Sequence, residues 1–141
     1  MTPLFTSEQI PQLIPQRPPI VMIDSVLSAD EQGVTTALTI QEDNIFLYDG
    51  RLAEAGLIEH MAQTAAAFAG VRNIAEHTEP KLGFIGEVKD FHCHLLPQAG
   101  DTLTTSLTTV ADMAGVRLVA CQTTIGQQPV SDGYLKIVIR D

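Results

Sequence analysis

The sequence has 141 residues with 17 acidic and 8 basic side chains, so its formal net charge at pH 7 is −9. This excess of negative charge excludes nucleic acid and anionic lipid as main partners, because both would repel it. An apolar fraction of 45% with 18% charged residues is typical of a globular chain and not of a disordered one. The length fits a single domain over residues 1–141.

Two further features limit the class of protein. Cys93 and Cys121 are too few and too isolated for a disulfide framework or a zinc ribbon. No apolar run reaches the roughly 20 residues of a membrane span, because the most apolar stretch, 52–73, contains Glu, His, Gln and Thr. We therefore expect a cytoplasmic protein with no membrane span.

The first third of the chain predicts one short helical turn and two strands. Residues 7–14 begin with a candidate cap, Ser7, but Pro11 limits the helix to its first turns. Two segments rich in β-branched residues, 20–28 and 33–41, flank the sequence ADEQG. The glycine and the β-branched flanks predict a hairpin.

One long helix is predicted next, from Leu52 to about Asn73, and strands follow it. Four segments are separated by the turn sequences PQAG, MAG and GQQP, and they are 82–96, 101–112, 116–125 and 131–140. The helix is apolar on nearly all sides, so it needs cover on nearly all sides, which a curved sheet supplies. The sequence predicts an α+β fold in which an antiparallel sheet wraps around one long central helix.

One narrow stripe of this helix is small or polar throughout. At about 100° per residue, its members are Gly56, Glu59, Gln63, Ala66 and Gly70. Small residues let another group approach the helix closely, and a carboxylate there would be desolvated, as suits a general acid or base. Two interpretations stay open, a catalytic Glu59 or a helix-packing surface in a dimer where Glu59 is satisfied by backbone or arginine.

The histidines offer weaker candidates. His60 lies about 100° from Glu59 on the helix, so spacing alone does not make a dyad, and we expect a hydrogen-bonded histidine at the helix or dimer surface. Alternation along a strand places His92 and His94 on one face and Cys93 on the other. Two histidines without a nearby third ligand do not predict a metal site, so we expect none.

Four stretches carry a family resemblance, and they are GLIEHMAQTAAAF (56–68), LIPQRPPIVMIDSV (13–26), FIGEVKDFHCHLLPQAGDTL (84–103) and QPVSDGYLKIVI (128–139). Taken in their order along the chain, they resemble the 3-hydroxyacyl-acyl-carrier-protein dehydratases of fatty-acid synthesis. The first is similar to the family's helix motif of an acid followed by Met-Ala-Gln, and the second to its Pro-His-Arg-x-Pro sequence. The third is similar to the family's Phe-x-Gly and Pro-x-Gly-Asp-x-Leu, and the fourth to its closing strands.

The resemblance implies the hot-dog fold, a sheet rolled around one long helix, and dimers with acyl-thioester sites at the subunit interface. Glu59 matches the family's catalytic acid, and Gln63 matches the glutamine four residues later. The family's catalytic histidine, in Gly-His-Phe-Pro, has no counterpart, because DGRLAEAG (49–56) is several residues shorter and has Arg51 in its place. Gln16 likewise replaces the histidine of Pro-His-Arg. An arginine stays protonated and cannot take the α-proton of the substrate.

The leading hypothesis is an acyl-thioester-binding component of dehydratase type, similar to those of aryl-polyene lipid pathways, in which two hot-dog subunits share a site. Its 3-hydroxyacyl substrate would be carried on the phosphopantetheine of acyl carrier protein or of coenzyme A, with no other cofactor. Glu59 is the catalytic candidate, and the substrate-binding candidates are Gly56, Gln63, Ala55 and Arg51. The amides near Ala55 and Gly56 would polarise the thioester carbonyl, and Arg51 would hold a phosphate or a partner's carboxylate.

Two other functions stay open. A thioesterase on the same fold would use Glu59 as base or nucleophile and would not need the missing histidine. A non-catalytic subunit would stabilise a catalytic partner and keep Glu59 for structure. We expect a homodimer or a heterodimer with a second hot-dog subunit, and in the leading hypothesis that partner supplies the proton-abstracting histidine.

Overall fold

The computed structural model describes residues 2–140, apart from the side chain of Leu82. In chain order its elements are a 3₁₀-helix (Ile10–Gln12), β1 (Ser25–Ala29), β2 (Gly33–Thr39), β3 (Leu47–Tyr48), β4 (Arg51–Leu52), α1 (Glu54–Glu76), β5 (Leu82–Cys93), β6 (Thr102–Met113), β7 (Val116–Ile125) and β8 (Gln128–Arg140). No helix in this part of the chain is long and apolar enough to cross a bilayer.

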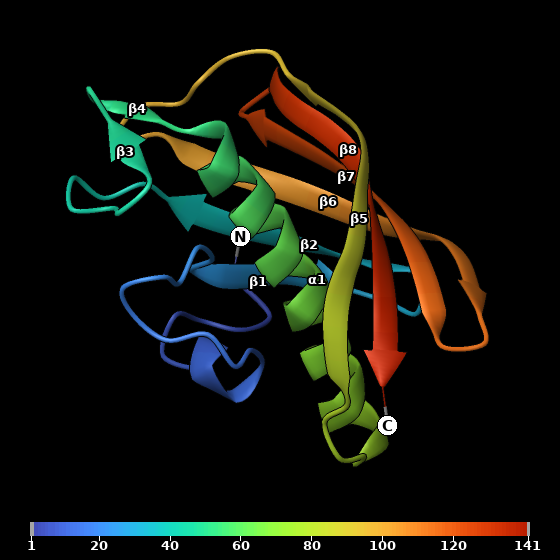
Figure 1. The fold of residues 1–141 in the computed structure, drawn as a ribbon. Coiled ribbons are helices and arrows are strands. Elements are labelled where there is room, and N and C mark those ends of the chain that lie inside the picture. Colours follow the sequence, from blue (N-terminus) through green and yellow to red (C-terminus); the bar gives the residue numbers. More distant parts are fainter. Residues whose placement is uncertain (1, 141) are drawn as a thin grey trace.

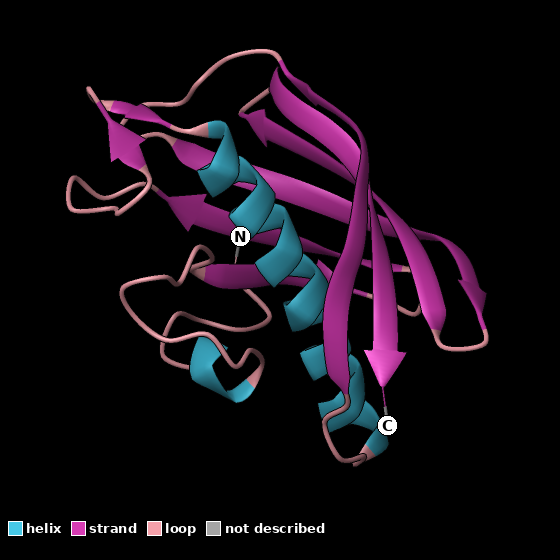
Figure 2. Cartoon of the chain, in the orientation of Figure 1, coloured by secondary structure: helices cyan, strands magenta, loops and turns pink. Residues whose placement is uncertain are grey.

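The main sheet has six strands in the order β1-β2-β6-β7-β8-β5, and every pairing is antiparallel. It curves around one side of α1, and the N-terminal segment with the 3₁₀-helix lies on the other side (Figures 1 and 2). This is the sheet wrapped around one helix that the residue pattern predicted, and it is the hot-dog arrangement that the family resemblance implied. The curved sheet gives the helix the cover that its apolar composition requires, and Leu57, Met61 and Phe68 are each at most 1% exposed.

The first strand differs from the prediction. Residues 20–28 were expected to form it, but β1 starts only at Ser25. The backbone of Ile20–Met22 is hydrogen-bonded to helix side chains and not to a neighbouring strand. Sequence periodicity does not distinguish a strand from an extended segment that crosses a helix, because both can alternate.

The helix also differs slightly at its ends. It begins at Glu54, two residues later than predicted, and it continues three residues beyond Asn73. His77 ends it in the left-handed conformation, with φ of 54°, and its amide donates back to the carbonyl groups of Asn73 and Ile74. The predicted helical turn at 7–14 is reduced to the three residues of the 3₁₀-helix, as Pro11 suggested.

A small hairpin that was not predicted precedes α1. Strands β3 and β4 pair through Tyr48 and Arg51, and both turn residues between them have positive φ, 50° for Asp49 and 77° for Gly50. Asp-Gly is the dipeptide that such a two-residue turn favours, so a local signal was present. The hairpin is held against the connection before β6, because the Leu52 amide donates to the Pro97 carbonyl at 2.7 Å.

Candidate functional site

The centre of the candidate site is a pair of helix side chains one turn apart. Glu59 is half-buried, and its Oε2 accepts a hydrogen bond of 2.8 Å from Nε2 of Gln63. Gln63 is fully buried. Its Nε2 also donates to the Ile20 carbonyl at 2.7 Å, and its Oε1 accepts from the Met22 amide at 2.5 Å. The structure therefore brings together the two residues that the family resemblance had singled out.

The glycines of the same stripe are covered by the protein's own chain. A Cβ on Gly56 would lie 2.7 Å from Cβ of Phe46, and a Cβ on Gly70 would lie 2.2 Å from the Leu13 carbonyl oxygen. Another group does approach these glycines closely, as the sequence predicted. That group is the protein's own chain, Phe46 at Gly56 and Leu13 at Gly70. Packing thus accounts for the missing side chain of Gly56, whose contact with a substrate stays a prediction.

His60 lies in the core and not at the surface, so the expected position was wrong. Its exposure is 0%, and both ring nitrogens are hydrogen-bonded, Nδ1 to the Met22 carbonyl at 2.6 Å and Nε2 to the Thr105 hydroxyl at 2.8 Å. Burial lowers the pKa of His60 to about 4, although the bond to Met22 opposes that shift. The imidazole is therefore neutral at pH 7.

His60 sits on a row of buried hydroxyl groups that the sequence analysis missed. The row crosses the inner face of the sheet at directly paired positions, and its members are Thr36, Thr105, Thr123 and Ser131. The hydroxyl oxygens of Thr105 and Thr123 are hydrogen-bonded at 2.6 Å, whereas Ser131 Oγ has no hydrogen-bond partner among the described residues. The only signal in the sequence was threonine at inward positions, which does not separate a buried row from an exposed one.

The helix N-terminus offers fewer free amides than predicted. Ala53 is the capping residue and has no polar side chain, and the Gly56 amide donates to the Ala53 carbonyl at 2.9 Å. Of the two amides assigned to a substrate carbonyl, that of Gly56 is thus already engaged. Ala55 is an exposed residue in the first turn of the helix, and its amide remains the candidate.

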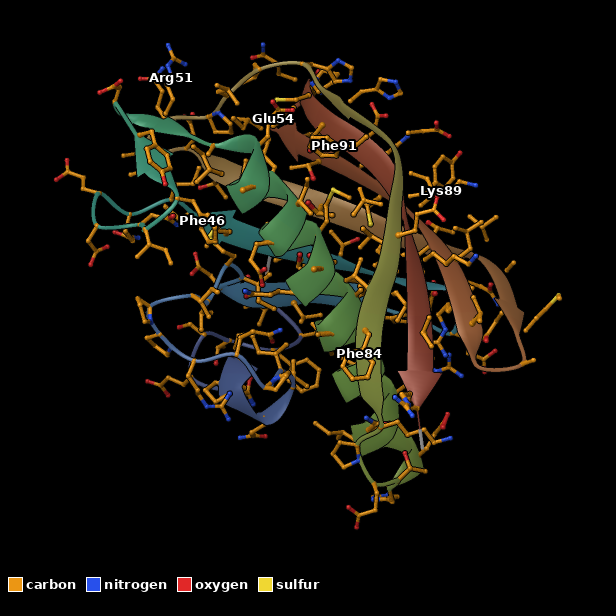
Figure 3. The ribbon with its side chains drawn as sticks, viewed as in Figure 1. Phe46, Arg51, Glu54, Phe84, Lys89 and Phe91 are labelled. Carbon is orange, nitrogen blue, oxygen red and sulfur yellow. The ribbon has the colours of Figure 1, made fainter. Side chains whose placement is uncertain are left out.

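Arg51 lies on the hairpin and does not join the Glu59 pair. Its Nη1 donates to the Leu96 carbonyl at 3.0 Å, and Figure 3 shows its side chain extending away from α1. The guanidinium group is exposed, so it remains available to an anionic group of a ligand or partner. Its role in binding stays a prediction.

His92 and His94 share one face of the sheet, as alternation predicted. Their nearest nitrogens lie 3.1 and 2.8 Å from the two carboxylate oxygens of Asp132 on β8. These hydrogen bonds lower the pKa of Asp132, and the bond from His94 contributes most. All three side chains are substantially exposed. Neither these three residues nor any other group of His, Cys, Asp and Glu within residues 2–140 is arranged to hold a metal ion.

Among residues 2–140, no histidine is hydrogen-bonded to Glu59. His60 bonds to Met22 and Thr105, His92 and His94 bond to Asp132, and His77 ends the helix. Two surface hollows, of about 380 and 520 Å³, lie elsewhere, at the C-terminal end of α1 and beside the end of β2. The chain alone thus provides an oriented acid without a base beside it.

A family model described as ApeP-like, ApeP dehydratase, matches residues 8–141. The chain belongs to the ApeP-like dehydratase family. This membership confirms the dehydratase resemblance drawn from the four stretches of the sequence. No curated protein sequence matches the chain significantly.

Solved structures similar to this ApeP-like protein share its hot-dog fold. The dehydratase heterocomplex ApeI:P from Xenorhabdus doucetiae matches with a TM-score of 0.87 at 18% identity, over 100% of this chain and 93% of that one. Cj0977, a sigma28-regulated virulence protein from Campylobacter jejuni, matches with a TM-score of 0.74 at 13% identity, over 96% and 90%. A hypothetical thioesterase with coenzyme A from Streptococcus pneumoniae matches with a TM-score of 0.62 at 10% identity, over 82% and 84%. At these identities the likeness concerns the fold alone.

Proposed function

We propose that this ApeP-like protein is the acid-bearing half of a divided dehydratase site that acts on 3-hydroxyacyl thioesters. The observation that carries the proposal is the partly exposed Glu59 carboxylate, which is oriented by Gln63 at 2.8 Å and has no histidine bonded to it among residues 2–140. Dehydration needs both an acid and a base. A second hot-dog subunit would supply the base.

The reaction would proceed as a β-elimination. A histidine of the partner takes the α-proton, the electrons of that bond form the C2–C3 double bond, and the C3–O bond breaks. Glu59 donates its proton to the departing hydroxyl, so that water leaves and a trans-2-enoyl thioester remains. The amide of Ala55, an exposed residue in the first turn of the helix, would stabilise the negative charge that develops on the thioester oxygen.

An exposed edge of the main sheet is an argument for a partner subunit. Strand β5 is the last strand of the sheet, and its side chains from Gly83 to Asp90 are all exposed. Three of them are large and apolar, Phe84, Ile85 and Val88, with exposures of 47, 40 and 36%. An unprotected edge of this kind invites pairing with another strand. We propose that a second hot-dog subunit pairs there, as the heterocomplex among the similar structures suggests.

We further propose that the acyl chain arrives on phosphopantetheine, from acyl carrier protein or coenzyme A, in the synthesis of a fatty acid or polyene lipid. A thioester would supply the acidic α-proton that elimination requires. The family match supports dehydration as the reaction type, and the thioesterase with coenzyme A shows that a similar fold accepts a phosphopantetheine ligand.

Enoyl absorbance measured with and without the partner tests this function. The isolated protein should interconvert 3-hydroxyacyl and trans-2-enoyl thioesters slowly or not at all, since a missing general base costs roughly 10²–10⁴ in rate. Adding the native hot-dog partner should restore the reaction, and Glu59→Gln in this subunit should abolish the gain. Full activity of the isolated protein would contradict the divided site.

The same assay separates the two other candidate functions. The similar thioesterase structure favours hydrolysis as the second candidate, and thiol release that disappears in Glu59→Gln would support it. If the partner is equally active with wild-type protein and with Glu59→Gln, this subunit only stabilises its partner.

A further inference from the structure

The segment Ile20–Met22 is held to α1 by side chains and not by a strand. Three consecutive peptide groups take part: the Ile20 carbonyl and the Met22 amide bond to Gln63, and the Met22 carbonyl bonds to His60. Each of these bonds is between 2.5 and 2.7 Å long. Gln63 and His60 are three residues apart on the helix, so they lie on the same side and hold the segment from two points.

The roles of donor and acceptor in this network follow from the backbone. A carbonyl oxygen only accepts, so the proton of His60 must be on Nδ1, which donates to Met22. Nε2 then accepts from the Thr105 hydroxyl, and the hydrogen between Thr105 and Thr123 must come from Thr123. The tautomer of His60 is therefore fixed by its partners.

The orientation of Gln63 is fixed by the same reasoning. The Met22 amide only donates, so it must meet the amide oxygen of Gln63, and the NH₂ group points the other way. One hydrogen of that NH₂ goes to Ile20 and the other to Glu59. Every polar atom of the Gln63 amide is used, and its two bonds to the backbone cannot change without a movement of the segment or of the amide.

We propose that His60 is a positioning residue for the Glu59 carboxylate and acts on it through the Ile20–Met22 segment and Gln63. His60 does not touch Glu59 itself. If the Met22 carbonyl lost its bond to His60, the Met22 amide would no longer be held against Gln63 at the same place. The Gln63 amide would then rotate or shift, and its bond to Glu59 would change. The proposal rests on the proposed function for the reaction that the carboxylate performs.

Two substitutions of His60 separate this role from a purely structural one. The amide nitrogen of asparagine is as many bonds from the backbone as Nδ1, so His60→Asn keeps a donor for Met22 and loses Thr105. The end of a glutamine side chain corresponds to Nε2, so His60→Gln keeps Thr105 and loses Met22. Each variant loses one buried hydrogen bond, so their urea midpoints should fall by similar amounts.

Thr36→Val is the matched control. It removes the 2.8 Å hydrogen bond between the hydroxyl groups of Thr36 and Thr64. Thr64 lies one turn of α1 after His60, but this bond does not involve the Ile20–Met22 segment. Its urea midpoint should fall like those of the His60 variants, while the kinetic constants of the complex stay unchanged.

Activity with the partner subunit gives the first measurement. His60→Gln should lower kcat roughly tenfold to a hundredfold with KM within about threefold, as expected for a misplaced catalytic group. His60→Asn should recover most of that loss. Equal losses of kcat in the two variants, or losses that follow the urea midpoints in all three proteins, would overturn the proposal.

The side-chain amide of Gln63 gives the second measurement, which needs neither partner nor substrate. Its two ¹⁵N–¹H resonances should shift and exchange faster with water in His60→Gln, and should stay close to wild type in His60→Asn and Thr36→Val. Unshifted resonances in His60→Gln would overturn the proposal even if the complex is a dehydratase. A wild-type complex without dehydratase activity would instead overturn the proposed function, while these shifts would still support the link from His60 to Glu59.

Discussion

Glu59 and His60 are neighbours in the sequence, yet they lie in different surroundings. His60 faces the sheet with 0% exposure, and both its nitrogens are bonded. Glu59 is only partly buried, and one of its oxygens accepts a hydrogen bond from Gln63. A buried imidazole whose two nitrogens are both hydrogen-bonded cannot form a further hydrogen bond to a substrate. A partly exposed carboxylate that uses one oxygen for Gln63 can do so with the other. Two adjacent polar residues thus differ in whether they have hydrogen-bonding capacity left for a ligand.

The largest expected effect is a loss of stability at low pH, which is caused by the buried neutral imidazole of His60. The pKa of His60 is about 4 in the folded protein and 6.5 in the unfolded one, so the unfolded state binds the extra proton between these values. Stability is therefore complete above pH 6.5 and falls as the pH drops towards 4. The shift of about 2.5 units corresponds to roughly 3 kcal/mol of unfolding free energy.

Urea titrations between pH 7 and 4.5 measure this loss, and His60→Asn is the reference because its side chain does not titrate. Burial raises the pKa of Asp24, which acts in the opposite direction in acid, but Asp24 is present in both proteins and cancels in the difference. Parallel pH profiles for wild type and His60→Asn would contradict the buried neutral histidine.

A smaller effect should come from filling the stripe on the Glu59 side. Gly70→Ala places a Cβ 2.2 Å from the Leu13 carbonyl oxygen, and a backbone atom cannot move away as a flexible side chain can. We expect a loss of about 1–3 kcal/mol in the unfolding free energy. Gly86→Ala is the control, because its Cβ would lie 3.3 Å from a Val138 methyl group that can rotate. Equal stability of the two variants would mean that the N-terminal segment is not packed on the helix.

The smallest effect is expected for the stability of Glu59→Gln. The substitution keeps the size of a half-exposed side chain and an oxygen that can accept from Gln63, so the unfolding free energy should change by less than about 0.5 kcal/mol. Thermal and urea unfolding of the isolated protein measure it. A loss above about 2 kcal/mol would assign Glu59 a structural role and would remove the contrast with His60.

Part of the candidate site was predictable because it is local or carried by a motif. The helix motif located Glu59 and Gln63, and their spacing of four residues placed both on one stripe of the helix. The Asp-Gly turn of the β3–β4 hairpin was also readable from the sequence, but the prediction missed it. The bonds of Gln63 to Ile20 and Met22 were not predictable, since they join positions 41 or more residues apart.

By itself, the sequence determined the elements whose pattern is local: one long apolar helix, four strands after it, and an acid and a glutamine on a stripe of small residues. Only the tertiary structure decided which group covers each side of that helix. The wheel separates Glu59 from His60 by about 100°, but it does not say which direction meets the sheet. That choice depends on contacts between distant segments, such as Thr105 with His60 and Leu13 with Gly70. Burial and hydrogen-bond partners, which set the protonation of His60 and orient Glu59, exist only once the chain has packed.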